Sequence, residues 1–123
     1  MKVKKVKIGI KSLGQVFDDV KNVLKRIEQG ERLKPVKGPE IYFTSFDALR
    51  KGLTSKRLEL LHIIKTKKPS SINELARMAK RDIKNVAGDV KYLERIGLIE
   101  TKESHRKKAP IINYDRIAFE IAV

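Results

Sequence analysis

The stretch from Thr54 to Tyr114 limits the fold most strongly, because three amphipathic segments follow one another there with only short turns between them. TSKRLELLHIIKTK, SINELARMAK and DIKNVAGDVKYLERIGLIE each repeat apolar residues at the spacing of a helix. The next run, LIETKESHRKKAPIINY, has apolar ends around a basic centre, which predicts a β-hairpin. Three short helices and a hairpin are therefore expected to share one small core.

The start of the second helix is marked by Ser71 and Glu74, which form the S-x-x-E pattern of a capping box. Helical spacing then predicts which side chains of each helix face the core. For the first helix these are Leu58, Leu60, Leu61, Ile63 and Ile64; for the second, Ile72, Leu75, Ala76 and Ala79; for the third, Ile83, Val86, Ala87, Val90, Leu93 and Gly97.

The N-terminal part is predicted to be a strand followed by a helix. Residues 2–10 alternate, with Val6, Ile8 and Ile10 on one side, and Ser12 with Gln15 opens a helix that runs to Gly30. Residues 30–39 are expected to be a connector, 41–45 a short strand, 45–52 a brief helix and 117–123 a last strand. The expected organisation is an extension at 1–53, a compact domain at 54–114 and a C-terminal strand at 115–123.

Charge favours a polyanionic partner. The chain has 123 residues, with 29 Lys and Arg against 15 Asp and Glu, which gives a formal net charge of +14. A Lys-rich proteome could produce the same balance in a protein that binds nothing acidic. Both explanations stay open on composition alone.

Catalytic and metal-binding groups are sparse. Cysteine is absent, and the two histidines have no third ligand at metal spacing. There is neither a G-x-S-x-G nor a phosphate-binding glycine loop. We expect a protein that is not an enzyme and that needs no cofactor or metal. The basic N-terminus lacks a continuous apolar run, so a cytoplasmic location is expected.

Three helices followed by a hairpin is the order of a winged helix-turn-helix. The expected fold is therefore mainly α with a small β component: a three-helix core, a hairpin wing and the N-terminal strand-helix extension. In such a unit the second helix crosses the phosphate backbone, the third lies in the major groove and the wing reaches nearby. These roles predict a recognition helix at 82–96 and a basic wing near 105–108. The candidate DNA-binding residues are Ser70, Ser71, Lys84, Asn85, Gly88, Lys91, Tyr92, Arg95, His105, Arg106, Lys107 and Lys108.

Gly88 has two explanations. A glycine in a helix interior costs ~1 kcal/mol relative to alanine, and this one falls on the solvent side of the third helix. It could permit close approach to a groove, or it could be a packing contact or a tolerated accident. Its neighbour Asp89 would repel phosphate unless it accepts a hydrogen bond from a base or is neutralised by a cationic side chain from another part of the fold.

The same region resembles a known family. SINELARMAKRDIKNVAGDVKYLERIGLIE followed by a basic hairpin is similar to MarR-like winged-helix transcriptional regulators, with LERIGLI at the entry to the wing. The likeness covers roughly residues 54–114. More narrowly, the chain resembles small archaeal and bacterial DNA-binding proteins, some of which look like antitoxins. The resemblance implies base contacts from the positions of Lys84, Asn85 and Gly88, where glycine departs from the long side chains usual in the family.

Three functions remain open. The leading one is sequence-specific binding to double-stranded DNA as a transcriptional regulator. The others are an antitoxin-like protein that mainly binds a toxin-like partner, and a non-specific nucleic-acid binder. A homodimer is expected through the first long helix, around Phe17, Val20 and Leu24, with the terminal strands pairing nearby. The alternative is that this helix packs on its own chain.

Overall fold

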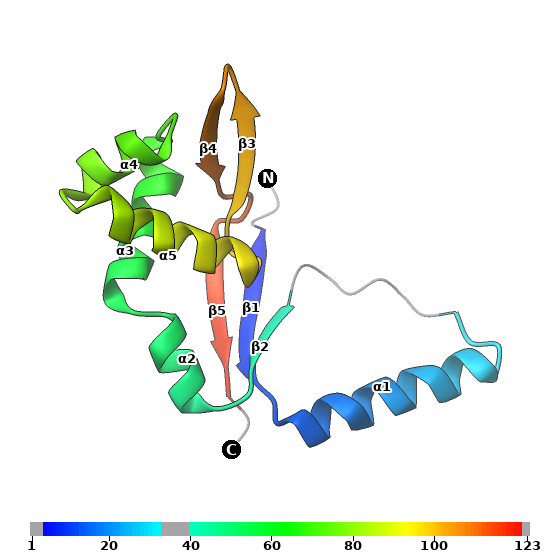
Figure 1. Cartoon of the computed structure of the whole chain (residues 1–123). Coiled ribbons are helices and arrows are strands. Elements are labelled where there is room, and N and C mark those ends of the chain that lie inside the picture. The colour runs from blue at the N-terminus through cyan, green and yellow to red at the C-terminus, as the bar shows by residue number, and fades with distance from the viewer. Residues whose placement is uncertain (1–3, 33–39, 122–123) are drawn as a thin grey trace. The chain divides into compact units, whose positions relative to one another are not determined.

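The computed structural model describes residues 4–32 and 40–121. Figure 1 shows both helices and strands, so the chain is mixed α/β. It forms two compact units, Met1–Gly52 with Tyr114–Val123, and Leu53–Asn113. The elements, in chain order, are β1 (Lys5–Ile10), α1 (Leu13–Glu28), β2 (Glu40–Phe43), α2 (Phe46–Gly52), α3 (Ser55–Lys67), α4 (Ile72–Ala79), α5 (Ile83–Arg95), β3 (Glu100–Ser104), β4 (Lys107–Ile111) and β5 (Arg116–Glu120).

The first unit contains a three-stranded parallel sheet in the order β2-β1-β5. Val6 and Ile8 share one side of β1 and are buried, as their alternation predicted. On the other side, a Cβ added at Gly9 would lie 3.1 Å from the carbonyl oxygen of Glu120 and 3.1 Å from the Tyr42 ring. The neighbouring strand and ring therefore favour glycine at this position.

The parallel pairing of β1 with β5 joins the two ends of the chain. The C-terminal strand, expected as a separate segment at 115–123, belongs to the same compact unit as β1. The expected ends of these two strands at 2–3 and 122–123 lie outside the described residues, as does most of the connector expected at 30–39.

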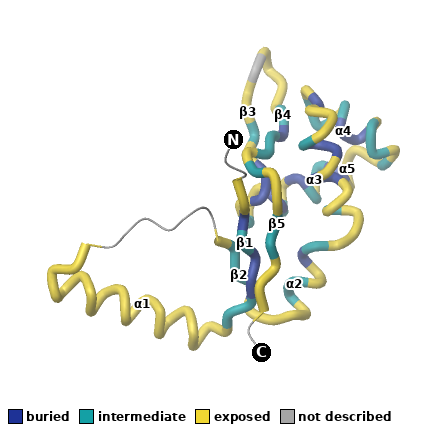
Figure 2. The backbone as a smooth tube through the Cα atoms, turned by 180° about the vertical axis from the view of Figure 1, so that it is seen from behind, coloured by how far each residue is buried: buried dark blue, intermediate teal, exposed yellow. Residues whose placement is uncertain are grey.

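Helix α1 begins at the predicted capping box. The Ser12 hydroxyl accepts a hydrogen bond from the Gln15 backbone N–H at 3.2 Å, and the Gln15 side chain accepts one from the Ser12 N–H at 3.0 Å. The helix ends before Gly30, which has a positive φ of 79°. Every residue of α1 is exposed, as Figure 2 shows along its length.

The second unit holds α3, α4, α5 and the antiparallel hairpin β3-β4. Helix α4 packs against both α3 and α5, and β4 contacts α3 and α4. This order is consistent with a winged-helix-like fold. The side chains that fill the core are Leu60, Leu61, Ile63, Ile64, Leu75, Ala76, Val86, Val90, Leu93, Leu98 and Ile99.

Three predicted core residues are wrong. Gly97 is exposed, because it lies beyond the end of α5 with a positive φ of 93°. Leu58 is 38% exposed and Ile83 is 44% exposed. Ile83 is the first residue of α5, directly after the Asp82 cap, and Leu58 is in the first turn of α3. Helical spacing includes such end residues in an apolar row, although the partner helices do not cover them.

Candidate nucleic-acid interface

Helix α5 presents a basic row to solvent. Lys84, Gly88, Lys91 and Arg95 follow one another at intervals of four, three and four residues, so they lie on one stripe of the helix. All four are exposed, whereas the opposite stripe contributes Val86, Val90 and Leu93 to the core. We call these four residues the α5 row. Packing of the apolar stripe fixes which way the row faces.

Gly88 has open space where a side chain would be. A Cβ built at this position meets no heavy atom within 4 Å outside its chain neighbours and its own helix backbone. Its φ is not in the positive range that favours glycine. Within the described chain, therefore, neither packing nor backbone conformation requires glycine here.

Asp89 lies between two arginines from other parts of the unit. Nε of Arg57 on α3 donates to Oδ1 at 3.0 Å, and an Nη of Arg81 donates to Oδ2 at 2.8 Å. Burial alone would raise the pKa of Asp89, but the hydrogen bonds from Arg81 and Arg57 outweigh it and hold that pKa below its ordinary value. The carboxylate is therefore ionised, and cationic side chains from other parts of the fold offset its charge.

Tyr92 and Asn85 lie beside the α5 row on the flank that includes Asp89. The Arg57 guanidinium stacks on the Tyr92 ring, 4.1 Å from its centroid, and Tyr92 is half-buried. Asn85 is exposed, and its backbone N–H donates to the Asp82 side chain, which caps the helix, at 3.3 Å. The structure thus gives Tyr92 a packing contact and leaves Asn85 accessible.

The N-terminus of α4 is capped by protein groups. The Ser71 hydroxyl accepts from the Glu74 N–H at 3.1 Å, as predicted, but the Glu74 carboxylate bonds to the N–H and hydroxyl of Ser70 at 3.3 and 3.0 Å. In the expected capping box the Glu74 carboxylate would accept from the N–H of Ser71, but it accepts from Ser70. A carboxylate already occupies the position where Ser70 and Ser71 were expected to receive a phosphate, so a phosphate at this helix end would meet like charge.

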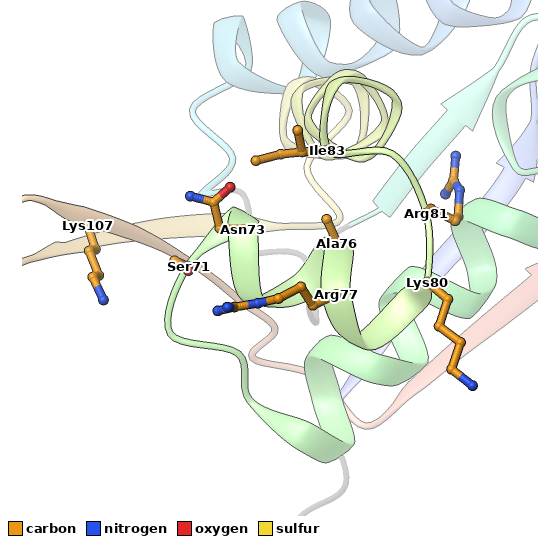
Figure 3. Close-up of a pocket in the computed structure, with 8 residues that line it drawn as sticks. All are labelled: Ser71, Asn73, Ala76, Arg77, Lys80, Arg81, Ile83 and Lys107. Carbon is orange, nitrogen blue, oxygen red and sulfur yellow. The ribbon is translucent and has the colours of Figure 1, made fainter.

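A basic hollow of about 650 Å³ lies beside α4, and we call it the α4 hollow. Figure 3 shows the residues that line it, which come from α4, from the turn before α5, from the start of α5 and from β4. Arg77 and Lys80 were not among the residues expected from the sequence, although both lie at the end of the second helix, one turn from the predicted recognition helix. The lining residues are Ser71, Asn73, Ala76, Arg77, Lys80, Arg81, Ile83 and Lys107.

A second hollow of about 390 Å³ lies between α5 and the hairpin, and we call it the wing hollow. Lys91 and Arg95 of the α5 row line it together with Lys108 of β4. Glu94 is the one acidic residue among its lining residues. The structure therefore brings predicted residues of the helix and the wing into one basic depression.

The tip of the wing consists of His105 and Arg106 between paired strands. Both are exposed, and both have positive φ, 50° and 66°. Two positive φ angles in a two-residue loop are typical of a type I′ turn, which normally favours Asn-Gly. A non-glycine residue with a positive φ costs of order 1 kcal/mol. The tip therefore keeps the imidazole of His105 and the guanidinium of Arg106 at some cost in backbone energy.

Two further features were considered for residues 4–32 and 40–121, a metal-ion site and a membrane-spanning helix. No group of three His, Cys, Asp or Glu side chains is placed to hold a metal ion there. None of the helices in that part of the chain is long and apolar enough to cross a membrane.

The chain is similar to a family model and to solved structures of known proteins. The model of the HVO_A0114 family matches residues 52–119. The chain is also similar to the crystal structure of a MarR-like transcriptional regulator from Thermotoga maritima, with a TM-score of 0.46 and 15% identity over 84% of this chain. The chain spans 66% of that structure's length. No curated protein matches the chain in sequence.

Proposed function

The chain belongs to the HVO_A0114 family, and we propose that its second unit binds double-stranded DNA in a sequence-specific manner as a transcriptional regulator. The observation that carries this proposal is the α5 row, flanked by the basic α4 hollow and wing hollow. Within Leu53–Asn113 the sequence has fifteen Lys and Arg against seven Asp and Glu, a net charge of +8. An exposed basic row with two basic depressions beside it suits a duplex, whose two phosphate strands border each groove.

In this proposal the α5 row enters the major groove. Lys84, Lys91 and Arg95 are long enough to reach base edges or the phosphates that border the groove, and Asn85 can pair with adenine from the adjacent flank. Gly88, at the centre of the row, lets the helix backbone approach the bases. The open space at Gly88 supports this role, because no contact within the described chain explains the glycine.

Phosphate contacts come from α4 and from the wing. Arg77 and Lys80 reach one strand from the α4 hollow, and Lys107 and Lys108 reach the DNA from the wing, with Arg106 at its tip. These contacts fix the register of the protein on the duplex and carry most of the salt-dependent affinity. Contacts at the capped start of α4 are not part of the proposal, because Glu74 is already there.

Asp89 does not make this flank repel DNA, because with Arg57 and Arg81 it forms a cluster of net charge +1. The two arginines that bind it cancel its charge on the flank of the recognition helix, so it does not repel the phosphates beside the groove. The same ion pairs connect α3 and the turn before α5 to α5, which holds the row in one orientation.

Selection from random duplexes, followed by titration of the selected sequence at several salt concentrations, tests the proposal. We expect an enriched sequence that binds tighter than its scrambled version, with affinity for both falling as salt rises. Equal affinity for the two duplexes would instead indicate a nucleic-acid binder that uses charge alone. Absence of binding at low salt would exclude DNA as the partner.

A further inference from the structure

No part of the chain that the structure describes covers the apolar face of helix α1. Seven large apolar side chains share one stripe, and Phe17, Val20 and Leu24 at its centre are 65%, 50% and 55% exposed. Together they form a patch on the order of 600 Å², the size at which exposed apolar surface on a soluble protein usually marks an interaction site. The members of this stripe are Leu13, Val16, Phe17, Val20, Val23, Leu24 and Ile27.

The sheet of the same unit does not offer this face a matching surface. Paired residues of parallel strands point to the same side, so Lys7, Glu40 and Ala118 share one face. That face is polar, and it includes an ion pair between Lys7 Nζ and a Glu120 carboxylate oxygen at 3.1 Å. The other face of the sheet is apolar, and its centre, where Val6 and Ile8 lie, is already buried.

The stripe is symmetric about one residue. Counting outward from Val20, apolar residues occur at three, four and seven positions in both directions. If two copies of α1 cross antiparallel at Val20, each apolar residue meets another one: Phe17 meets Val23, Val16 meets Leu24, and Leu13 meets Ile27. A chain segment with this pattern is complementary to itself across a two-fold axis.

The charges of α1 favour the same arrangement. Within Leu13–Glu28 three acidic and three basic side chains cancel, in a chain of net charge +14. Asp18 and Asp19 precede Val20, whereas Lys21, Lys25 and Arg26 follow it. An antiparallel second copy therefore places the acidic part of one helix beside the basic part of the other, and it also opposes the two helix dipoles. A parallel copy would place like charges together.

We propose that α1 is the contact between two copies of this chain, paired antiparallel about Val20. This contact involves only the first unit and does not depend on the DNA-binding function. Residues 52–119, which match the family model, do not include α1. Two second units would then be held in one symmetric assembly by a helix outside the family-matched region.

Sedimentation equilibrium at micromolar concentration tests the assembly. We expect a mass of twice 14.1 kDa for the chain. Val20→Glu should raise the dissociation constant of the dimer about 30-fold or more, because it places a charge at the centre of the contact. The matched control is Asn22→Glu, which puts the same charge on the opposite side of α1 and should leave the dimer intact. A monomeric wild-type chain, or equal effects of the two variants, would overturn the proposal.

Disulfide trapping tests the orientation, since the natural chain has no cysteine. Leu13→Cys and Ile27→Cys are made separately, and circular dichroism checks that each retains its helices. Antiparallel pairing predicts a disulfide-linked species only when the two variants are mixed. Self-linked species from each variant alone would show parallel pairing and overturn the arrangement. Trapping needs no DNA, and DNA binding by the second unit can be measured in the Val20→Glu monomer. The dimer and the DNA-binding function are therefore tested independently.

Discussion

Arg57 donates to Asp89 across 3.0 Å and at the same time stacks on Tyr92, so one side chain of α3 holds two successive turns of α5. Arg81, in the turn before α5, donates to the other carboxylate oxygen of Asp89 at 2.8 Å. The exposed α5 row is thus supported by a charged cluster as well as by the apolar core.

Asp89→Asn should lower the free energy of unfolding by about 2–3 kcal/mol, because it leaves two largely buried guanidinium groups without a counter-charge. The Asp89 side chain is only 16% exposed, so water cannot replace the lost partner fully. Urea denaturation followed by circular dichroism measures the change. Glu59→Gln, an exposed change on α3, is the control and should stay within about 0.5 kcal/mol of the wild type. Similar values for the two variants would show that the cluster contributes little.

The Asp89 cluster should also make stability depend on acid pH. The pKa of Asp89 is held below its ordinary value of 3.8, so its contribution is complete at neutral pH. That contribution begins to fall as the pH drops through the ordinary value and is lost below the pKa in the folded state. The stability difference between wild type and Asp89→Asn should therefore shrink between about pH 5 and about pH 2. A difference that stays constant over this range would contradict the prediction.

Gly88→Ala should change stability and DNA affinity in opposite directions. The added methyl group enters open space, so the higher helix propensity of alanine should stabilise the chain by ~1 kcal/mol. If Gly88 lies against the bases, the same methyl group weakens DNA binding, and Gly88→Gln should weaken it further. Thermal unfolding and fluorescence anisotropy provide the two measurements. Unchanged or tighter binding by both variants would remove Gly88 from the interface.

Replacing Arg106, Lys107 and Lys108 together by alanine should weaken binding to every duplex by a similar factor. Each phosphate contact contributes about 0.9 to the slope of log affinity against log salt, so the slope should flatten by up to about 2.7. Anisotropy titrations at several salt concentrations, on the selected and scrambled duplexes, measure both effects. A loss confined to the selected duplex would mean that the wing reads bases, and an unchanged slope would exclude it from phosphate contact.

Local features of the fold followed from the sequence. The Ser12 box, the three helices of the second unit and the two-strand hairpin are where spacing and capping residues predicted them. These signals act over a few residues and need no knowledge of distant contacts. At helix ends the same rules were less accurate, and Glu74 bonds to Ser70 although the box pattern assigned it to Ser71.

Contacts between residues far apart in the sequence could not be predicted from spacing and capping residues. The parallel pairing of Lys5–Gly9 with Arg116–Glu120 joins segments more than a hundred residues apart, and alternation alone does not specify a partner strand. The two arginines around Asp89 come from α3 and from the turn before α5, beyond the reach of helical neighbours. Arg77 and Lys80 became candidates only when the fold placed Lys107 beside them.

The most direct test of the DNA-binding account is the affinity of one double variant for a selected duplex. Lys84→Ala with Lys91→Ala removes two charges from the α5 row, and Lys56→Ala with Lys67→Ala removes two charges from exposed positions of α3, outside both hollows. Anisotropy titration should show that the wild type and the α3 variant bind the selected duplex about 100-fold or more tighter than a scrambled one. The α5 variant should lose most of that preference while it remains folded. Equal losses in the two variants, or a wild type that does not distinguish the duplexes, would contradict recognition of DNA by α5.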